Sequence, residues 1–79
     1  MNSNDYEPIS CDLHSEYELL AMHRTPVTVQ YLDDAGAEQH FQGSVTDIFT
    51  RDGAEYMRLE GGGGTLEVRL DRIERVRKH

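Results

Sequence analysis

The sequence has no tryptophan, one cysteine and two prolines, and its 8 Lys and Arg residues face 15 Asp and Glu residues, which gives a net charge of −7. The single Cys11 excludes an internal disulfide and fits a reducing compartment. No apolar run approaches the ~18 residues that a membrane span needs, and residues 1–8 are acidic where a signal peptide is basic and then apolar. We therefore expect a cytoplasmic protein without a membrane segment.

The length sets a second limit. A chain of 79 residues forms one domain and buries only ~60% of its unfolded surface. A core of that size leaves little room for an enclosed active site, so we do not expect an enzyme. Residues 1–79 are predicted to form a single domain made of an N-terminal arm (1–10), a helix (11–24) and a β-barrel (26–77).

The helix is predicted from its start signal and its periodicity. Asp12 lies where the positive end of a helix dipole favours an acid, and the segment from Asp12 to His23 contains no Gly or Pro. At helical spacing, one face is expected to point to the core and carries Leu13, Tyr17, Leu20 and Ala21. Cys11, Ser15, Glu18 and Met22 lie on the opposite face, with His14 near its edge.

Five short strands are predicted after Pro26. Residues 27–32 alternate in polarity, and turns are expected at 33–36, at 51–53 and in the glycine tract 61–64. Residues 37–50 are long for one straight strand, so a bend or bulge is expected at Gly43. Phe41, Val45 and Phe49 are the expected core anchors of this strand. After strands around 56–59 and 66–70, one helical turn at 70–73 leads into a fifth strand at 73–76. The fold class is α+β: one helix packed on a small, closed, antiparallel five-stranded barrel of the SH3 or Sm kind.

Catalytic and metal sites are weakly supported. Cys11 and His14 are three residues apart at the helix start, and His23 or His40 could join them, but a structural zinc site needs four ligands, usually in paired spacings. A cysteine nucleophile would need a third group and a pocket that the spacing does not supply. We expect no cofactor and no metal.

RNA binding is an alternative from a different class. Small barrels often stack bases on strand aromatics beside a basic groove, and Tyr31, Phe41, Tyr56 and the basic residues 69–79 offer part of that chemistry. The acidic body opposes it, because phosphate contacts require Lys or Arg. An Sm-like RNA-binding module that assembles into rings remains the alternative.

The outer face of the helix points to a protein partner. Leu19 and Met22 are surrounded by polar and charged residues, namely Asp12, His14, Glu16 and Glu18. Apolar residues inside a charged rim are typical of a protein interface, although an ordinary solvated helix face shows the same pattern. Because an acidic body is steered toward basic surfaces, the residues predict an acidic interaction domain with a basic partner.

Three segments stand out in one colinear order from about Tyr6 to Val76: Tyr6-Glu7-Pro8-Ile9-Ser10-Cys11-Asp12, the acidic helix with Glu18-Leu19, and Leu66-Glu67-Val68-Arg69-Leu70-Asp71-Arg72-Ile73. Together they resemble the Rof family, the bacterial Rho-specific inhibitors of transcription termination. The resemblance implies a helix on an Sm-like five-stranded barrel, no catalysis, and binding to the basic, aromatic-lined RNA-loading domain of the Rho hexamer. It also implies inhibition of Rho-dependent termination because RNA loading is blocked.

The same resemblance implies the contact residues. Asp12 and Glu18 match acidic positions of the family's helix, Arg51 matches a basic position, and His14, Ser15, Asp52 and Gly53 depart from the family pattern. Glu18 is the expected acceptor for a Lys or Arg of Rho, with Asp12 and Glu16 in support. The expected Rho-binding residues are Asp12, His14, Ser15, Glu16, Glu18, Met22, Arg51 and Asp52. We expect no direct nucleic-acid binding, no membrane partner, and a monomer when the protein is free.

Overall fold

The structure is a computed structural model that describes residues 9–79. Most of the predicted arm (1–10) lies outside the described residues. Helix α1 spans Cys11–Met22, and its N-terminus is capped by Ser10, whose Oγ accepts a hydrogen bond from the Leu13 amide at 3.2 Å. Asp12 lies in the first turn, as predicted. Ser10 gives one free amide of the first turn a hydrogen-bond partner, and the negative charge of Asp12 favours the positive end of the helix dipole.

Helix α1 ends two residues before the predicted position 24 because Arg24 leaves the helical conformation, with φ at 50°. The Arg24 amide donates to the Ala21 carbonyl, and the Thr25 amide donates to the Leu20 carbonyl. This pair of bonds defines a Schellman motif, which usually places glycine where Arg24 stands. The sequence offers no glycine there, so the exact end of the helix could not be predicted.

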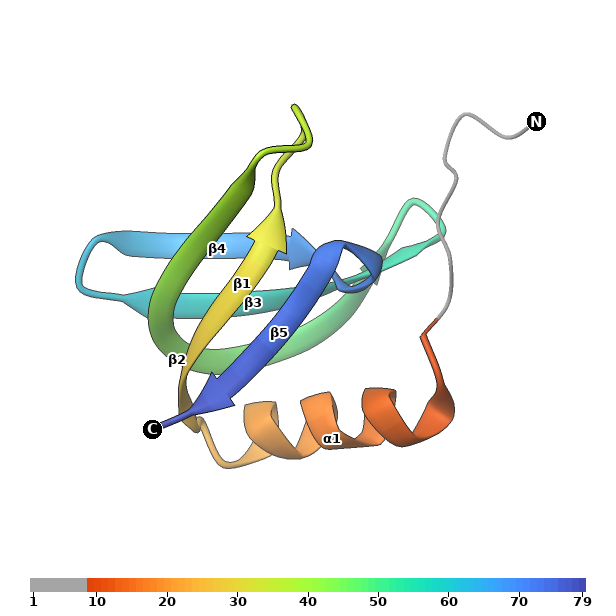
Figure 1. Ribbon diagram of the computed structural model, residues 1–79. Helices are drawn as coiled ribbons and strands as arrows, with labels where there is room; N and C mark the ends of the chain where they lie inside the picture. The colour runs from red at the N-terminus through yellow and green to blue at the C-terminus, as the bar shows by residue number, and fades with distance from the viewer. Residues whose placement is uncertain (1–8) are drawn as a thin grey trace.

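The five strands are β1 (Pro26–Leu32), β2 (Glu38–Arg51), β3 (Ala54–Gly61), β4 (Gly64–Arg69) and β5 (Ile73–Lys78), with a one-turn helix η1 (Leu70–Arg72) before β5. They form one antiparallel sheet in the order β4-β3-β2-β1-β5, and α1 lies against one end of this curved sheet (Figure 1). The α+β class, the five strands and the helical turn before the last strand are confirmed.

The closed barrel predicted over 26–77 is wrong. Strands β4 and β5 are the two edges of the described sheet and do not pair with each other. Helix η1 turns the chain so that β5 runs obliquely to β4 and pairs with β1 instead (Figure 1). The sheet curves strongly but stays open.

Two tight turns are made by acidic residues. Asp52 and Gly53 have φ values of 52° and 80°, so the two-residue loop between β2 and β3 has positive φ at both positions, which is why Asp-Gly is favoured there. Between β1 and β2, the Asp33 carboxylate accepts hydrogen bonds from the amides of Ala35 and Ala37, both at 2.9 Å. Hydrogen bonds, first of all from Gln39, hold the pKa of Asp33 below its ordinary value.

A β-bulge at Thr46 divides the long strand β2. Val45 pairs with Leu59 and Ile48 with Met57, so three steps along β2 correspond to two along β3. Because side chains alternate along a strand, Val45 and Ile48 could not both face the core without the extra residue. Both do pack in or against the core, and Thr46 Oγ1 donates to the Arg58 carbonyl at 3.4 Å.

The bulge corrects two predictions. It lies three residues after Gly43, where a bend or bulge was expected, and it turns Phe49 out of the core, where an anchor was expected. Phe41 and Val45, which precede the bulge, are core residues as predicted. Phe49 instead stacks on Tyr56 with ring centroids 5.5 Å apart.

Gly43 serves a different purpose from the one predicted. A Cβ atom on Gly43 would lie 2.5 Å from the Glu60 carbonyl oxygen, and a Cβ on Gly61 would collide with the Gln42 carbonyl oxygen. These two glycines therefore allow β2 and β3 to approach each other closely.

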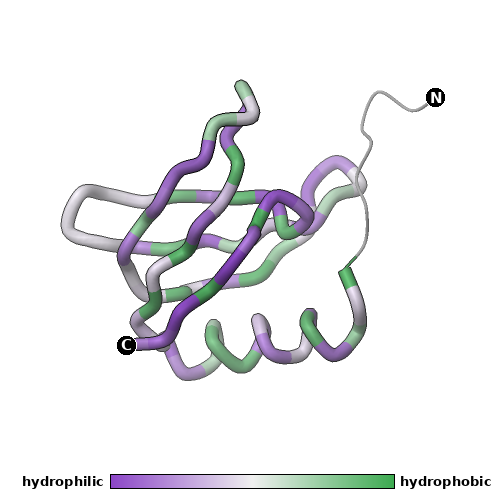
Figure 2. The backbone as a smooth tube through the Cα atoms, viewed as in Figure 1, coloured by the Kyte–Doolittle hydropathy of each residue, from purple (hydrophilic) through white to green (hydrophobic). Residues whose placement is uncertain are grey.

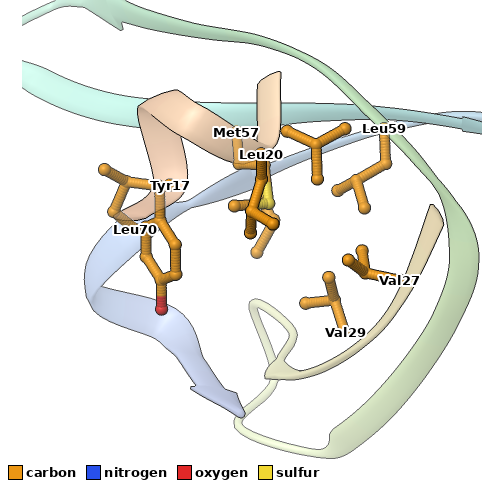
Figure 3. Close-up of a cluster of buried hydrophobic side chains, with 9 residues drawn as sticks. Tyr17, Leu20, Val27, Val29, Met57, Leu59 and Leu70 are labelled. Carbon is orange, nitrogen blue, oxygen red and sulfur yellow. The ribbon is translucent and has the colours of Figure 1, made fainter. Parts of the chain in front are cut away.

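The core joins the helix to both halves of the sheet. Its buried side chains include Tyr17, Leu20, Val27, Val29, Met57, Leu59 and Leu70 (Figure 3), together with Val45 and Val68. Leu13 and Ala21 pack against this cluster, which confirms the predicted inner face of the helix. Val27, Val29, Val45, Met57 and Leu59 are fully buried, so β1, β2 and β3 together supply the centre of the core.

Replacing Gly43 with alanine should destabilise the fold by about 1–3 kcal/mol, because the nearest obstructing atom, the Glu60 carbonyl oxygen, belongs to a backbone and cannot rotate away. The matched control is Gly62→Ala, where the added Cβ has no neighbour within 4 Å and the change should stay within about 0.5 kcal/mol. Urea unfolding measures both. Equal stabilities of the two variants would contradict the close approach of β2 and β3.

Candidate partner-binding site

The outer face of α1 carries the exposed large hydrophobic side chains of residues 9–79. Leu19 is 52% exposed and Met22 is 72% exposed. Figure 2 shows hydrophobic and hydrophilic stretches alternating along the helix. The predicted outward positions Cys11, Ser15, Glu18 and Met22 are all exposed, as are Asp12 and Glu16. The structure therefore exposes five of the eight predicted contact residues on the helix, namely Asp12, Ser15, Glu16, Glu18 and Met22.

Each flank of α1 meets the sheet at a shallow depression. The α1–β2 groove is lined by Glu18, Ala21, Met22, Thr46, Asp47 and Ile48. The α1–β5 depression is lined by Glu16, Leu19, Leu20, His23, Thr25 and Lys78. The two exposed hydrophobic residues thus belong to different depressions, and an acid of the helix accompanies each of them.

His14 connects the helix to the β2–β3 hairpin. Its Nε2 donates a hydrogen bond of 2.8 Å to Glu55 Oε2, and its Nδ1 lies 3.6 Å from Glu18 Oε1. The His14 side chain is 25% exposed, whereas Glu18 is 57% exposed. His14 therefore links the helix to β3 and stands beside Glu18, and its side chain is less exposed than that of Glu18.

Tyr17 lies under this surface. Burial, with a smaller contribution from the neighbouring Glu16 carboxylate, raises the pKa of the Tyr17 phenol. The raised pKa reflects the position of the phenol in the core cluster, where burial disfavours its charged form.

Arg51 and Asp52 lie at the tip of the β2–β3 hairpin, which α1 contacts through His14. The Arg51 guanidinium lies 5.0 Å from the centroid of the Phe49 ring, and its Nη1 lies 3.1 Å from Glu67 Oε1. Because Phe49 pairs with Tyr56 while Glu55 pairs with Thr50, these two pairs point to opposite faces of the hairpin. The structure therefore does not bring the Arg51 side chain together with His14 and Glu18.

Glu67 organises the arginines on that opposite face. Its carboxylate accepts from Arg58 at 2.9 Å and 3.2 Å and pairs with Arg51. The hydrogen bond from Arg58 is the main reason that the pKa of Glu67 lies below its ordinary value, and Arg51 adds to the effect. Arg58 also lies 5.2 Å from the Phe49 centroid, so both guanidinium groups have a ring and a carboxylate as neighbours.

The features that favoured RNA binding are largely engaged within the protein. Tyr31 and Phe41 are partly buried against the core. Arg69 makes a two-point contact with Asp71 at 2.7 Å and 2.9 Å, and Arg72 donates to the Asp33 carbonyl at 3.0 Å. Arg75, Arg77 and Lys78 on β5 are exposed.

Within residues 9–79, no three His, Cys, Asp or Glu side chains converge to hold a metal ion. Cys11 is exposed and has no disulfide partner. No helix in this part of the chain is long and apolar enough to cross a membrane.

Three residues near the site were not predicted from the sequence. Glu55 binds His14, Glu67 holds Arg51, and Asp47 lines the α1–β2 groove. The only signal for Glu55 is its place two residues after the Asp52-Gly53 turn, and its use depends on where α1 docks. Asp47 reaches the groove beside the bulge, which has no sequence signal.

The class that the structure defines is a small acidic domain of one helix on a curved five-stranded sheet, with Leu19 and Met22 exposed on the helix. Residues 8–79 match the family described as "Modulator of Rho-dependent transcription termination (ROF)". The chain belongs to this ROF family, which confirms the predicted resemblance.

Two curated relatives agree with this assignment. The chain is 32% identical over 71 residues to "Protein rof" of Escherichia coli (strain K12), covering 90% of this chain and 80% of the relative. The same identity and coverage hold for "Protein rof" of Shigella flexneri.

Replacing Glu67 with glutamine should lower stability at neutral pH. The pKa of Glu67 in the folded protein lies below the ordinary value of 4.5, so its ionised form stabilises the fold above that pH and this contribution disappears as the pH falls through the lowered pKa. The difference between wild type and Glu67→Gln should therefore narrow below about pH 4.5.

The check is the free energy of urea unfolding at a series of pH values. Glu60→Gln is the control, because Glu60 is an exposed carboxylate near the C-terminal end of β3. Wild type and Glu67→Gln curves that run parallel through the acid range would count against the role assigned to Glu67.

Proposed function

We propose that this protein inhibits Rho-dependent termination by binding the primary RNA-binding domain of the Rho hexamer and blocking RNA loading. Membership in the ROF family supports Rho as the partner. The observation that carries the proposal is the exposed pair Leu19 and Met22 beside exposed helix acids, on a chain with a net charge of −7. A domain that loads single-stranded RNA combines a basic groove with aromatic side chains, so it is complementary to such a surface.

Electrostatics and apolar burial have separate roles in this proposal. The net negative charge steers the protein toward the basic groove and speeds association at low salt. Leu19 and Met22 then lose their contact with water at the centre of the interface, where apolar side chains contribute most of the affinity. Once this protein occupies the basic groove of Rho, RNA phosphates can no longer enter that groove.

The proposed contact residues fall into groups. Glu18 accepts from a Lys or Arg of Rho, and Asp12 and Glu16 reinforce the local negative potential. His14 acts by position, because its bonds already hold it between Glu55 and Glu18. The complete proposed set is Asp12, His14, Ser15, Glu16, Glu18, Met22, Arg51 and Asp52.

Arg51 and Asp52 form a second contact region in this proposal, at the hairpin tip. Because the Arg51 side chain points to the face opposite His14, a partner must wrap around the tip to touch both regions. We propose no catalytic role, and we expect a monomer when the protein is free. Sedimentation velocity measures that state.

The test is displacement of RNA from Rho. A labelled pyrimidine-rich oligonucleotide held by the Rho hexamer is titrated with this protein, and fluorescence anisotropy is recorded beside an oligonucleotide-only control. Loss of the Rho-bound signal, with no signal from the control, is the expected result. An unchanged signal would refute the proposal, and binding in the control would favour the Sm-like RNA-binding module.

Glu18→Lys should weaken binding to Rho by about 2–5 kcal/mol, because it removes one charge-assisted contact and adds repulsion in its place. The matched control is Asp34→Lys, which changes the net charge equally at an exposed turn between β1 and β2. Isothermal titration calorimetry with the Rho hexamer measures both variants. If the two bind equally, Glu18 is not in the interface and only net charge matters.

A further inference from the structure

The α1–β2 groove is lined by the apolar residues Ala21, Met22 and Ile48 (its floor) and by the acidic residues Glu18 and Asp47 (its walls). Met22 is the most exposed large hydrophobic residue of the described chain, and Ala21 and Ile48 are partly buried beside it. The charged residues that line the groove are Glu18 from the helix and Asp47 from β2, and both are exposed. No Lys, Arg or His lines it, whereas the α1–β5 depression contains Lys78 and His23.

The bulge at Thr46 builds the strand side of this groove. The extra residue returns Ile48 to the face that packs against the core and leaves Asp47 at the groove. A regular strand would have turned Ile48 away, and the groove would have lost its apolar floor. The groove is open to solvent and has a volume of about 450 Å³, so an extended side chain can lie in it.

We propose that the α1–β2 groove receives one long basic side chain, Lys or Arg, of Rho. Its aliphatic stem lies on Met22 and Ile48, and its cationic head lies between the carboxylates of Glu18 and Asp47. This inference rests on the proposed function and adds Asp47, Ile48 and the bulge to the contact surface. Asp47 is thereby a specificity residue that accepts from the cation.

The chemistry of the groove selects this occupant. An apolar side chain would cover the two carboxylates without giving them a partner, which is costly. An acidic side chain would be repelled by both walls. Lys and Arg bury their methylene stems on apolar surface while the charged end stays at a polar edge, so they match floor and walls together. RNA phosphates are excluded for the same reason as acidic side chains.

Asp47→Asn should weaken binding to the Rho hexamer on the order of tenfold, because a charge-assisted contact is lost while the shape is kept. The matched control is Asp34→Asn, which removes one charge at the β1–β2 turn, the end of the sheet away from α1 (Figure 1). Met22→Ser tests the apolar part of the groove. Because the Met22 side chain is largely exposed, this substitution should leave the stability of the fold unchanged. Calorimetry at two salt concentrations gives the affinities, and circular dichroism verifies folding.

Each outcome distinguishes the groove from the proposed function. If wild type does not bind Rho, the proposed function fails and the groove proposal fails with it. If wild type binds, and both Asp47→Asn and Met22→Ser bind as tightly as Asp34→Asn, the proposed function stands and the groove proposal is overturned. Selective weakening of both groove variants supports the groove.

Oxidation of methionine gives a second readout that needs no variant. Met22 is 72% exposed, whereas Met57 is fully buried in the core and serves as the internal reference. Dilute hydrogen peroxide should oxidise Met22 in the free protein, and saturating Rho should slow that oxidation several-fold while Met57 remains unreacted in both states. Equal oxidation of Met22 with and without bound Rho contradicts the proposal.

Discussion

The extra residue at Thr46 is the constraint on which most of this structure depends. It brings Val45 and Ile48 to the same side of β2, so that one strand can contribute to the core before and after the bend. The same shift sends Phe49 outward, where Tyr56, Arg51 and Arg58 gather around it. The packing of Ile48 against the core, the outer cluster around Phe49 and the strand side of the groove beside α1 all follow from one local change of register.

Local signals in the sequence were enough for the helix and the turns. Ser10 and Asp12 mark the helix start, and the Asp52-Gly53 pair specifies a tight hairpin, because these effects act within a few residues. The position of the bulge could not be predicted, because no residue type requires it and it is selected by the pairing of Val45 with Leu59 and of Ile48 with Met57. The closure of the sheet failed as a prediction for a similar reason, since the partner of β5 is decided by long-range packing.

The candidate site divides in the same way. The exposed acids of α1 and the exposed Met22 could be predicted from helical periodicity alone. The half-buried state of His14 could not, because Glu55 lies 41 residues further along the chain and meets it only after the helix docks. The sequence placed Arg51 in the site but did not show on which face of the hairpin its side chain lies. The alternation of side chains along β2 after the bulge puts Arg51 on the face opposite His14.

The hairpin between β3 and β4 has a consequence for how this small domain can be extended. Gly61 is confined by the backbone of β2, yet Gly62 and Gly63 have no neighbour within 4 Å, and the tip projects from the sheet on its own (Figure 1). The backbone is therefore confined at Gly61 and unconfined from the next residue, Gly62, onward. Beyond it, the cost of a longer loop is mainly the entropy of closure, which grows slowly with length. The tip is therefore a suitable insertion site for added sequence, such as a short tag that carries a fluorophore, because the insertion does not disturb the packing of the sheet.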